Sequence, residues 1–536
     1  MIKDLIRALS LANLCFMAVW SDLIATSINP RAQWARYDFS SYVAVLINVP
    51  ALAAVFWIAM ILVRRSRSAL ALDVARLAFL FVLPVAVNGI LLTQFPDLPT
   101  QAAAFLLRSG KTMALAVVIA GVGTGLMLRF RQAVIKAGLV FTLLLSPFCL
   151  LTFGQAIWLM TKFKEPPAPP VIATGSAKPQ RVLWLVFDEL DYRLAFVDRP
   201  ASLKLPELDS LRRAALFATN AHPPANQTLL SMPALITGKL VSEAIPSSPS
   251  ELSITYDETG EAVGWSTQPN LFSRAYAAGY NTAAIGWYHP YCRIIGGSLT
   301  YCAFIDRKSK PVTQKIPDQL RSVVGTIPLA ANVGLTKLPF LRKPDNQGEE
   351  SVSEAVAAYA DTLKEAKKVA TDGTIGLALV HWTIPHLPNI YDRDTGEFGG
   401  GEKNNYFDNL ALVDRALAEL RAAMEAAGVW EQTTLLITSD HPVRKRRQED
   451  KFPHLTPDEA AAEPARLDAR VPFLLKLAGQ QEGISYEAPF NTVLTHDLFL
   501  AILHGEITDP VGLTGWLDEN RSVAETRKAS KQKKDK

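Results

Sequence analysis

The stretch from Arg181 to Asp191, with the sequence RVLWLVFDELD, constrains the fold of this chain more than any other. Six consecutive apolar residues, Val182 to Phe187, run directly into two neighbouring carboxylates, Asp188 and Glu189. A continuous apolar run predicts a strand buried on both faces, as in a parallel sheet. Open α/β sheets bind ligands at the carboxyl ends of their strands. The two acids therefore indicate either a site or an ordinary solvated turn, and this stretch alone leaves both open.

Similar apolar runs alternate with segments of helical periodicity along the rest of the hydrophilic part. The candidate strands are Val182–Phe187, Thr282–Gly286, Ile375–His381, Thr434–Thr438 and Val471–Leu477. Apolar residues recur at intervals of three and four in Ser351–Thr371 and Tyr406–Ala427, which predicts helices. This alternation implies right-handed crossovers. The expected fold class is an α/β, doubly wound, mainly parallel sheet over residues 181–515.

The first 162 residues are much more apolar and predict a separate membrane domain. Hydrophobic residues make up 49% of the chain, which is high for a sequence with 20% charged residues. The five apolar segments are Leu5–Ile24, Tyr42–Val63, Leu70–Leu92, Met113–Leu128 and Val134–Met160. Most of them approach or exceed the roughly 20 residues that cross a bilayer as a helix. We expect five transmembrane helices over residues 1–162, although the first segment alone could be a signal peptide.

Basic residues set the expected orientation of these helices. Arg64 and Arg65 follow the second segment, and Arg129 and Arg131 lie between the fourth and the fifth. By the positive-inside rule both loops, and with them the N-terminus, are cytoplasmic. An odd number of crossings then places everything after Met160 on the outside.

The remaining boundaries follow from composition. Residues 163–180 contain five prolines and predict an extended, semi-rigid linker. The lysine-rich residues 516–536 predict a basic, disordered tail. A net charge of +4, with no basic patch interleaved with aromatic residues, argues against a nucleic-acid partner.

The four cysteines do not form a disulfide scaffold. Cys15 and Cys149 lie inside apolar runs and are expected to be inert. Cys292 and Cys302 flank a Gly-Gly turn and could pair in an oxidising compartment, or could be together by chance.

Two further stretches carry chemistry. In Asn226–Gly238, NQTLLSMPALITG, Thr228 precedes a helix-like turn, where its hydroxyl is either close to an anion site or an ordinary cap. In Thr433–His441, TTLLITSDH, another buried strand ends in Asp440 and His441. Together with Asp188, these residues offer three oxygens and one nitrogen to one divalent ion. That ligand set favours Zn²⁺, and Mn²⁺ is the alternative because oxygen dominates.

These motifs resemble the alkaline phosphatase/sulfatase superfamily, and most closely its membrane-anchored branch of phosphoethanolamine transferases and lipoteichoic acid synthases. The resemblance extends over roughly Val182–Leu503, through FDEL, TLLSMPALITG, HWTIPHLP, TSDH and RVPFLLKL. It implies a metal-binding role for Asp188, Asp440 and His441. Thr228 takes the place of both the nucleophile and a ligand.

The resemblance also implies roles for three further residues. Glu189 matches the second acidic ligand of sulfatases, or is an exposed turn carboxylate. His386 and His454 resemble the histidines that handle the phosphate and the leaving group, with a surface histidine as the alternative for His454. His381 ends a strand and is expected to be a core residue.

Departures from the family pattern narrow the expected activity. The chain has no Cys-x-Pro-x-Arg or Ser-x-Pro-x-Arg, so the formylglycine of true sulfatases cannot form. No Asp-x-x-x-His cluster for a second metal lies between Thr228 and Asp440. Pro442 replaces the usual glycine, and a basic run, Arg444–Arg447, follows. That run recognises a phosphate-bearing lipid or glycan, or is simply a solvated loop.

The resemblance therefore implies a transferase in the bacterial inner membrane, with its catalytic domain on the periplasmic side. A phospholipid would donate phosphoethanolamine or phosphoglycerol through a phospho-threonine to an envelope glycan or lipid. The metal would lower the pKa of the threonine hydroxyl. The alternatives are a hydrolase of phosphate or sulfate esters on the same fold and a catalytically inactive envelope scaffold.

Overall fold

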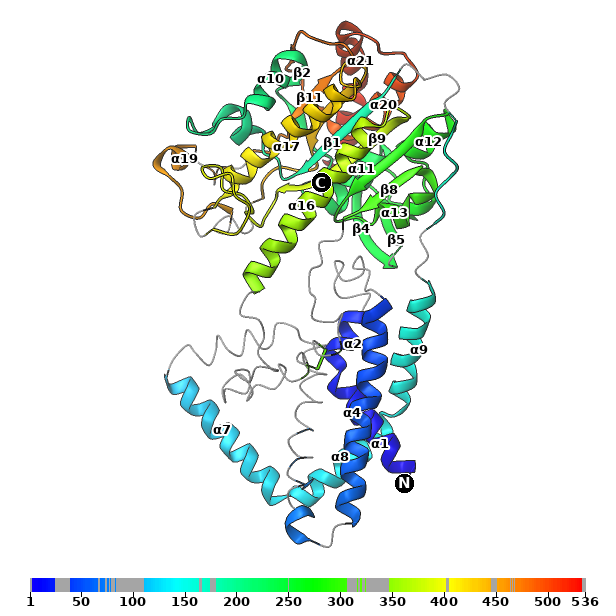
Figure 1. The fold of residues 1–536 in the computed structure, drawn as a ribbon, viewed down its shortest axis with the longest axis vertical. Helices are drawn as coiled ribbons and strands as arrows, with labels where there is room; N and C mark the ends of the chain where they lie inside the picture. Colours follow the sequence, from blue (N-terminus) through cyan, green and yellow to red (C-terminus); the bar gives the residue numbers. More distant parts are fainter. Residues whose placement is uncertain are drawn as a thin grey trace. The chain divides into compact units, whose positions relative to one another are not determined.

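The computed structural model divides the chain into two compact units, which are described separately here (Figure 1). The first comprises Met1–Phe163 and Lys310–Asp345, and the second Lys164–Ser309 and Asn346–Lys536. Apart from a few single residues, the structure describes residues 2–24, 39–65, 68–72, 110–162, 166–173, 180–248, 250–305, 347–401, 404–444, 451–462 and 468–532.

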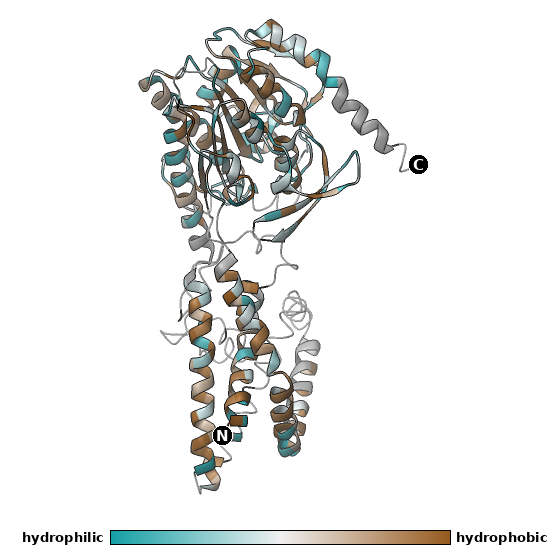
Figure 2. Ribbon diagram, turned by 90° about the vertical axis from the view of Figure 1, so that its right-hand side faces the viewer, coloured by the Kyte–Doolittle hydropathy of each residue, from teal (hydrophilic) through white to brown (hydrophobic). Residues whose placement is uncertain are grey.

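The first unit is helical. Its long helices are α1 (Ile2–Cys15), α2 (Met17–Ile24), α4 (Phe39–Arg65), α7 (Gly110–Arg129), α8 (Arg131–Leu144) and α9 (Pro147–Lys162). Apolar side chains of α2, α4 and α9, among them Trp20, Val45 and Leu159, pack into one buried cluster. Figure 2 shows long stretches of hydrophobic colour along the helices of this unit.

Among the described residues, one helix is long and apolar enough to cross a membrane. It is Ser40–Arg65, and a second span is present if Arg131–Leu144 and Pro147–Met160, which bend by 43°, count as one. The predicted segment Leu70–Leu92 lies mostly outside the described residues. Five spans therefore stay a prediction.

Polar contacts distinguish the two ends of α4. Near its C-terminus, Arg64 lies 2.7 Å from the buried carboxylate of Asp4 on α1. Near its N-terminus, the Asn48 amide donates to the side-chain oxygen of Gln319 at 3.0 Å, and the Gln319 amide donates to the Ser41 carbonyl at 2.9 Å. Within this unit, Gln319 thus contacts α4 in the half opposite Arg64.

The second unit contains an eight-stranded sheet in the order β12-β2-β11-β10-β1-β9-β7-β8. Its strands are β1 (Val182–Asp188), β2 (Leu216–Ala218), β7 (Asn281–Gly286), β8 (Tyr301–Phe304), β9 (Ile375–Pro385), β10 (Thr434–Ser439), β11 (Phe473–Lys476) and β12 (Ile484–Tyr486). The five predicted strands are all present. Only β11 is antiparallel to both of its neighbours, so the mainly parallel sheet is confirmed.

Helices cover both faces of this sheet (Figure 1). The apolar side chains of β1 alternate between the two faces, so each face has apolar surface that a helix can bury. Leu183 and Leu185 share one core with α16 (Gln347–Thr371) and α17 (Tyr406–Ala426). On the opposite face, Trp184 meets Phe499 of α20 (Thr495–Leu503) with ring centroids 5.4 Å apart. The predicted doubly wound layering is therefore confirmed.

Smaller elements complete the unit. The further strands are β3 (Ala221–His222), β4 (Val241–Ser248), β5 (Glu251–Tyr256), β6 (Ala262–Gly264) and β13 (Phe490–Asn491). The further helices are α10 (Pro206–Ala214), α11 (Thr228–Thr237), α12 (Leu271–Ala277), α13 (Tyr291–Ile294), α19 (Pro457–Ala461) and α21 (Pro510–Gln532).

The two segments predicted to flank this domain are both attached to it. In the proline-rich linker, the Ile172 backbone N–H donates to the Asn281 side chain at 2.8 Å, and the Asn281 amide donates back to the Ile172 carbonyl at 3.1 Å. The tail prediction needs a correction, because α21 runs through most of residues 516–536. Buried Leu513 and Leu517 hold the first turns of this helix on the domain.

Candidate functional site

Two acidic strand ends meet at one edge of the sheet. β1 and β10 are parallel and paired so that Phe187 lies opposite Ser439, which brings the next residues, Asp188 and Asp440, side by side. One ligand atom from each of these carboxylates and one from His441 all lie within 4.8 Å of one another. All three side chains are buried. Sheet topology therefore assembles the predicted Asp-Asp-His group.

The imidazole of His441 presents a lone pair to this group. Its Nδ1 lies 2.9 Å from the carbonyl oxygen of Pro442, which can only accept, so Nδ1 carries the proton. In the neutral ring Nε2 is then the nitrogen available to ligate a metal, and it lies 3.5 Å from a carboxylate oxygen of Asp188 and 3.5 Å from one of Asp440. A backbone carbonyl that fixes a histidine tautomer in this way is typical of metal ligands.

Thr228 is the first residue of α11 and contributes its hydroxyl to the same place. The side chain is 5% exposed, and its Oγ1 lies 3.3 Å from Nε2 of His441. The residue before the helix is Gln227, and no side-chain cap is formed there. Thr228 is therefore near a helix N-terminus, as predicted, but is not an ordinary cap.

The donor atoms of these four residues suit a divalent cation. Oδ1 of Asp440 accepts the backbone N–H groups of His441 at 2.9 Å and Glu189 at 3.3 Å, whereas its Oδ2 has no hydrogen-bond partner among the described residues. Two buried carboxylates beside an imidazole lone pair repel one another unless a positive charge separates them. A cation ligated by oxygen and one nitrogen fits this set.

The Glu189 carboxylate, expected to be either a metal ligand or an exposed turn group, is paired with two cationic side chains and is not in the Asp-Asp-His group. The side chain is fully buried, so it is no exposed turn carboxylate either. Its oxygens lie 2.7 Å from Nζ of Lys451 and 3.1 Å from Nε of Arg444. Burial alone would raise the pKa of Glu189, but the charges of His386, Lys451 and His441 lower it to about 2.

The three predicted histidines have different surroundings. The backbone N–H of His386 donates to the Asp188 carbonyl at 3.2 Å, which joins the end of β9 to the end of β1. His454 is exposed in a turn with φ 51°, so it is not buried with the group. His381 is a core residue, as predicted: it is fully buried, its Nδ1 lies 2.9 Å from the Tyr291 hydroxyl, and burial lowers its pKa to about 4.

The sequence analysis missed His289, which supports the backbone of Thr228. Its Nε2 lies 3.0 Å from the Thr228 carbonyl, which can only accept, so Nε2 donates. The ring is fully buried, and burial lowers its pKa to about 4, which keeps it neutral. A signal was present in the sequence, since His289 lies just after the apolar strand β7, as Asp188 lies at the end of the apolar strand β1.

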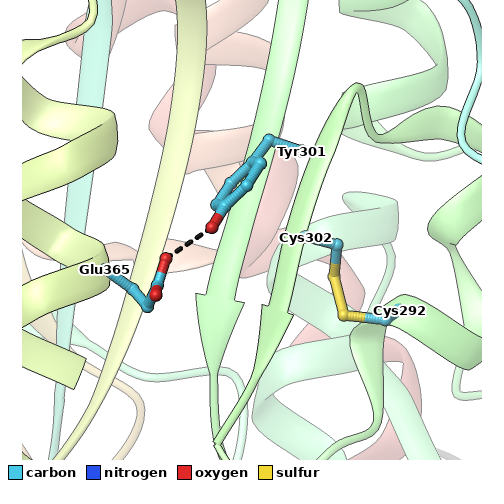
Figure 3. The surroundings of a disulfide bond; sticks show 4 residues. All are labelled: Cys292, Tyr301, Cys302 and Glu365. Carbon is cyan, nitrogen blue, oxygen red and sulfur yellow. Dashed lines mark hydrogen bonds between the residues drawn. A yellow bond between two sulfur atoms is a disulfide. The ribbon is translucent and has the colours of Figure 1, made fainter. Parts of the chain in front are cut away.

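A disulfide anchors the segment that carries His289. Cys292 and Cys302 are bonded, which resolves the alternative left open by their spacing (Figure 3). Next to the bond, the Tyr301 hydroxyl donates to Glu365 on α16. The disulfide therefore joins α13 to β8, and the hydrogen bond of Tyr301 joins β8 to α16.

Comparisons with known proteins agree with this geometry. The family model described as Sulfatase matches residues 180–504, which is more than half of the chain. A comparison with curated proteins found no match.

Several solved structures are similar to this chain at low identity. The PsFucS1 sulfatase from Pseudoalteromonas sp. is 15% identical over 61% of this chain and 68% of that chain, with a TM-score of 0.41. The lipoteichoic acid synthase LtaP from Listeria monocytogenes is 12% identical over 61% and 73%, with a TM-score of 0.37. The phosphonate monoester hydrolase SpPMH from Silicibacter pomeroyi is 14% identical over 61% and 73%, with a TM-score of 0.38. The match of the family model, which covers both acidic strand ends and Thr228, shows that the chain belongs to the sulfatase family.

Proposed function

We propose that this protein is a metal-dependent transferase that moves a phosphoethanolamine or phosphoglycerol head group from a phospholipid to an envelope glycan or lipid. One observation carries the proposal: the Thr228 hydroxyl lies 3.3 Å from Nε2 of His441, inside the buried group that includes Asp188 and Asp440. The absence of a formylglycine motif leaves this threonine as the nucleophile.

In the proposed reaction, Thr228 Oγ1 bonds to the phosphorus of the lipid head group, and the bond from phosphorus to the diacylglycerol oxygen breaks. The divalent metal, when bound, makes the hydroxyl more acidic and offsets charge on the phosphoryl oxygens. Asp188, Asp440 and His441 would hold that metal, with Zn²⁺ favoured over Mn²⁺ because one ligand is an imidazole.

Proton transfer completes each half of the reaction. The hydroxyl proton passes from Thr228 to water as the bond forms, and His386 donates a proton to the departing diacylglycerol oxygen. We favour His386 over the exposed His454, because the His386 backbone N–H donates a hydrogen bond to the Asp188 carbonyl. An acceptor hydroxyl then attacks the phospho-threonine and gives its proton to the neutral His386, and Thr228 leaves the phosphorus and takes a proton from water.

Two observations support a membrane location with the catalytic unit outside the cytoplasm. The Cys292–Cys302 disulfide is typical of an oxidising compartment such as the periplasm. The arginine end of α4 is expected in the cytoplasm. We therefore place the protein in the bacterial inner membrane, with the catalytic unit on the periplasmic side.

The proposal is tested by the intact mass of the full-length protein in detergent. The protein is incubated with phosphatidylethanolamine or phosphatidylglycerol and with Zn²⁺ or Mn²⁺. We expect an adduct of head-group phosphate mass in the wild type and none in Thr228→Ala. Thr228→Ser is the matched control, because it retains a hydroxyl and should form a reduced amount of adduct.

The outcomes separate the candidate activities. An adduct in Thr228→Ala would remove Thr228 as the nucleophile. Head group released to water, with no acceptor labelled, would favour the hydrolase on the same fold. A folded protein that binds no divalent ion and forms no adduct would favour an inactive scaffold.

A further inference from the structure

Glu189 is the centre of a second charged cluster, formed by Glu189, Arg444 and Lys451. One of its carboxylate oxygens lies 3.1 Å from Nε of Arg444, and the other lies 2.7 Å from Nζ of Lys451. The Glu189 and Lys451 side chains are 0% and 4% exposed. The carboxylate thus holds two cations at once, in a place where the sulfatase resemblance predicted a metal ligand.

The backbone of Glu189 explains why its side chain departs from Asp188. Its φ is 63°, a left-handed value that costs a residue with a side chain about 1 kcal/mol or more. Two hydrogen bonds hold this conformation: the Glu189 N–H donates to Asp440 at 3.3 Å, and the Tyr406 hydroxyl donates to the Glu189 carbonyl at 2.7 Å. The cluster is therefore tied directly to the Asp-Asp-His group.

The two cations differ in accessibility. Lys451 is buried, so its charge is paired with Glu189 and is not accessible to a ligand. Arg444 is 35% exposed, and only its Nε is engaged by Glu189 in the contacts described. Its partner Glu189 directly follows Asp188 and donates its backbone N–H to Asp440, so this ion pair holds the guanidinium near the Asp-Asp-His group. Arg444 is thus the member of the cluster that a ligand of the Asp-Asp-His group can reach.

Charge and geometry together indicate the ligand. One carboxylate against two cations leaves the cluster with one net positive charge, and a phosphodiester carries one negative charge. A guanidinium whose Nε is occupied retains N–H donors on its two terminal nitrogens, which suit the two unesterified oxygens of a phosphodiester. A fixed arginine loses less conformational freedom on binding than a mobile one.

We propose that Arg444 recognises the phosphodiester of the donor, and that Glu189 and Lys451 are positioning residues that hold its side chain near the Asp-Asp-His group. This inference rests on the proposed phosphodiester chemistry of that site. It assigns a function to one arginine of the basic run that follows the SDH motif.

The test compares Arg444→Gln with Arg415→Gln in the full-length protein. Arg415 is a matched control, because it is 42% exposed and its Nε lies 3.2 Å from Glu419 on the same helix, α17. The first readout is the rate of phospho-Thr228 formation against donor concentration. We expect Arg444→Gln to raise the half-saturating concentration about 10-fold or more, with the rate at saturation within about 2-fold of the wild type.

A second readout does not depend on turnover. The probe is dimethyl phosphate, a soluble singly charged phosphodiester, and its binding to the metal-loaded protein is measured by calorimetry. Wild type and Arg415→Gln should bind the probe equally, and Arg444→Gln about 10-fold more weakly. Arg444→Lys should recover part of the loss, because it keeps the charge but not the forked donors.

The two readouts separate this inference from the proposed function. A wild type that forms no phospho-threonine but binds dimethyl phosphate through Arg444 would overturn the transferase and support the anion site. Equal binding by wild type and Arg444→Gln, or no binding by the wild type, would overturn the role of Arg444.

The positioning role has its own variant. Glu189→Gln alone would leave Lys451 buried without a counter-ion and could unfold the protein. The double change Glu189→Gln with Lys451→Met removes one charge of each sign. We expect it to raise the half-saturating donor concentration about as much as Arg444→Gln, with the rate at saturation preserved. An unchanged half-saturating concentration would overturn the positioning role.

Discussion

Two charged clusters begin at Asp188 and Glu189, adjacent residues at the end of β1, and differ in where their balancing charge comes from. Asp188 lies with Asp440 and Nε2 of His441, and among the described residues no lysine or arginine belongs to that group. Glu189 faces Lys451 and Arg444, so its charge is neutralised within the chain. The first cluster could hold a cation, whereas the second contains two cations of its own and keeps one net positive charge. Two neighbouring acids therefore have different roles: Asp188 belongs to a candidate metal site, and Glu189 belongs to a network of ion pairs.

The largest expected effect is on the first cluster. Asp440→Asn removes one of its two carboxylates, and we expect the rate of phospho-Thr228 formation to fall about 10³-fold or more, because metal stabilisation is worth several kcal/mol. The melting temperature should rise on adding Zn²⁺ in the wild type and stay unchanged in the variant. A variant that is still stabilised by metal would break the distinction between the clusters.

Replacing each of the two adjacent acids by its amide should change the free energy of unfolding of the metal-free protein differently. Glu189→Gln breaks a buried ion pair, and we expect the free energy of unfolding to fall by about 3–5 kcal/mol. Asp188→Asn relieves repulsion between buried carboxylates, so the metal-free stability should be equal to or above that of the wild type. Chemical denaturation in a chelator measures both. Equal losses in the two variants would contradict the comparison.

A third test uses pH. Because the pKa of Glu189 is lowered to about 2, its contribution to stability is present above about pH 4.5 and is lost as pH falls towards 2. Buried Asp191 behaves in the opposite way: burial raises its pKa to about 6, so its contribution is present below about pH 3.8 and is lost as pH rises through 6. Each effect is at most about 3 kcal/mol.

Denaturation of Asp191→Asn across these pH values provides the check. The decrease in stability from pH 4 to 6 should become smaller in this variant, while the acid limb below pH 4 stays as in the wild type. An unchanged slope between pH 4 and 6 would show that Asp191 is not the responsible group.

The smallest expected effect tests whether the clusters are independent. Cys292→Ser opens a disulfide between residues separated by 10 in sequence, which should cost about 2–3 kcal/mol of stability. Because His289 in this loop holds the Thr228 carbonyl, phospho-Thr228 formation should slow. Dimethyl phosphate binding through Arg444 should change by less than about 2-fold, and Cys302→Ser is the matched variant. A large loss of binding would show that the clusters are coupled through the loop.

Local sequence was sufficient to predict the strands of the sheet and the candidate site formed by the Asp-Asp-His group and Thr228. The buried strands were predictable because a strand covered on both faces needs an uninterrupted apolar run, as in Val182–Phe187. Asp188, Asp440 and His441 were predictable as neighbours because parallel strands end at one edge of the sheet. Thr228 was predictable from its position before a helix-forming segment.

Local sequence was insufficient where long-range contacts choose a conformation. Nothing in FDEL indicates that Glu189 adopts φ 63°, since that value depends on bonds to Asp440 and Tyr406, over 200 residues away. The partnership of His289 with Thr228 likewise depends on how β7 and α11 pack.

The sequence by itself therefore determined the strands, their acidic ends and the candidate nucleophile, because periodicity and chain order are local properties. Tertiary structure alone decided which of two neighbouring carboxylates joins the Asp-Asp-His group and which holds Arg444 and Lys451. The physical reason is that a buried charge must be compensated. Only the folded chain brings the compensating groups within reach.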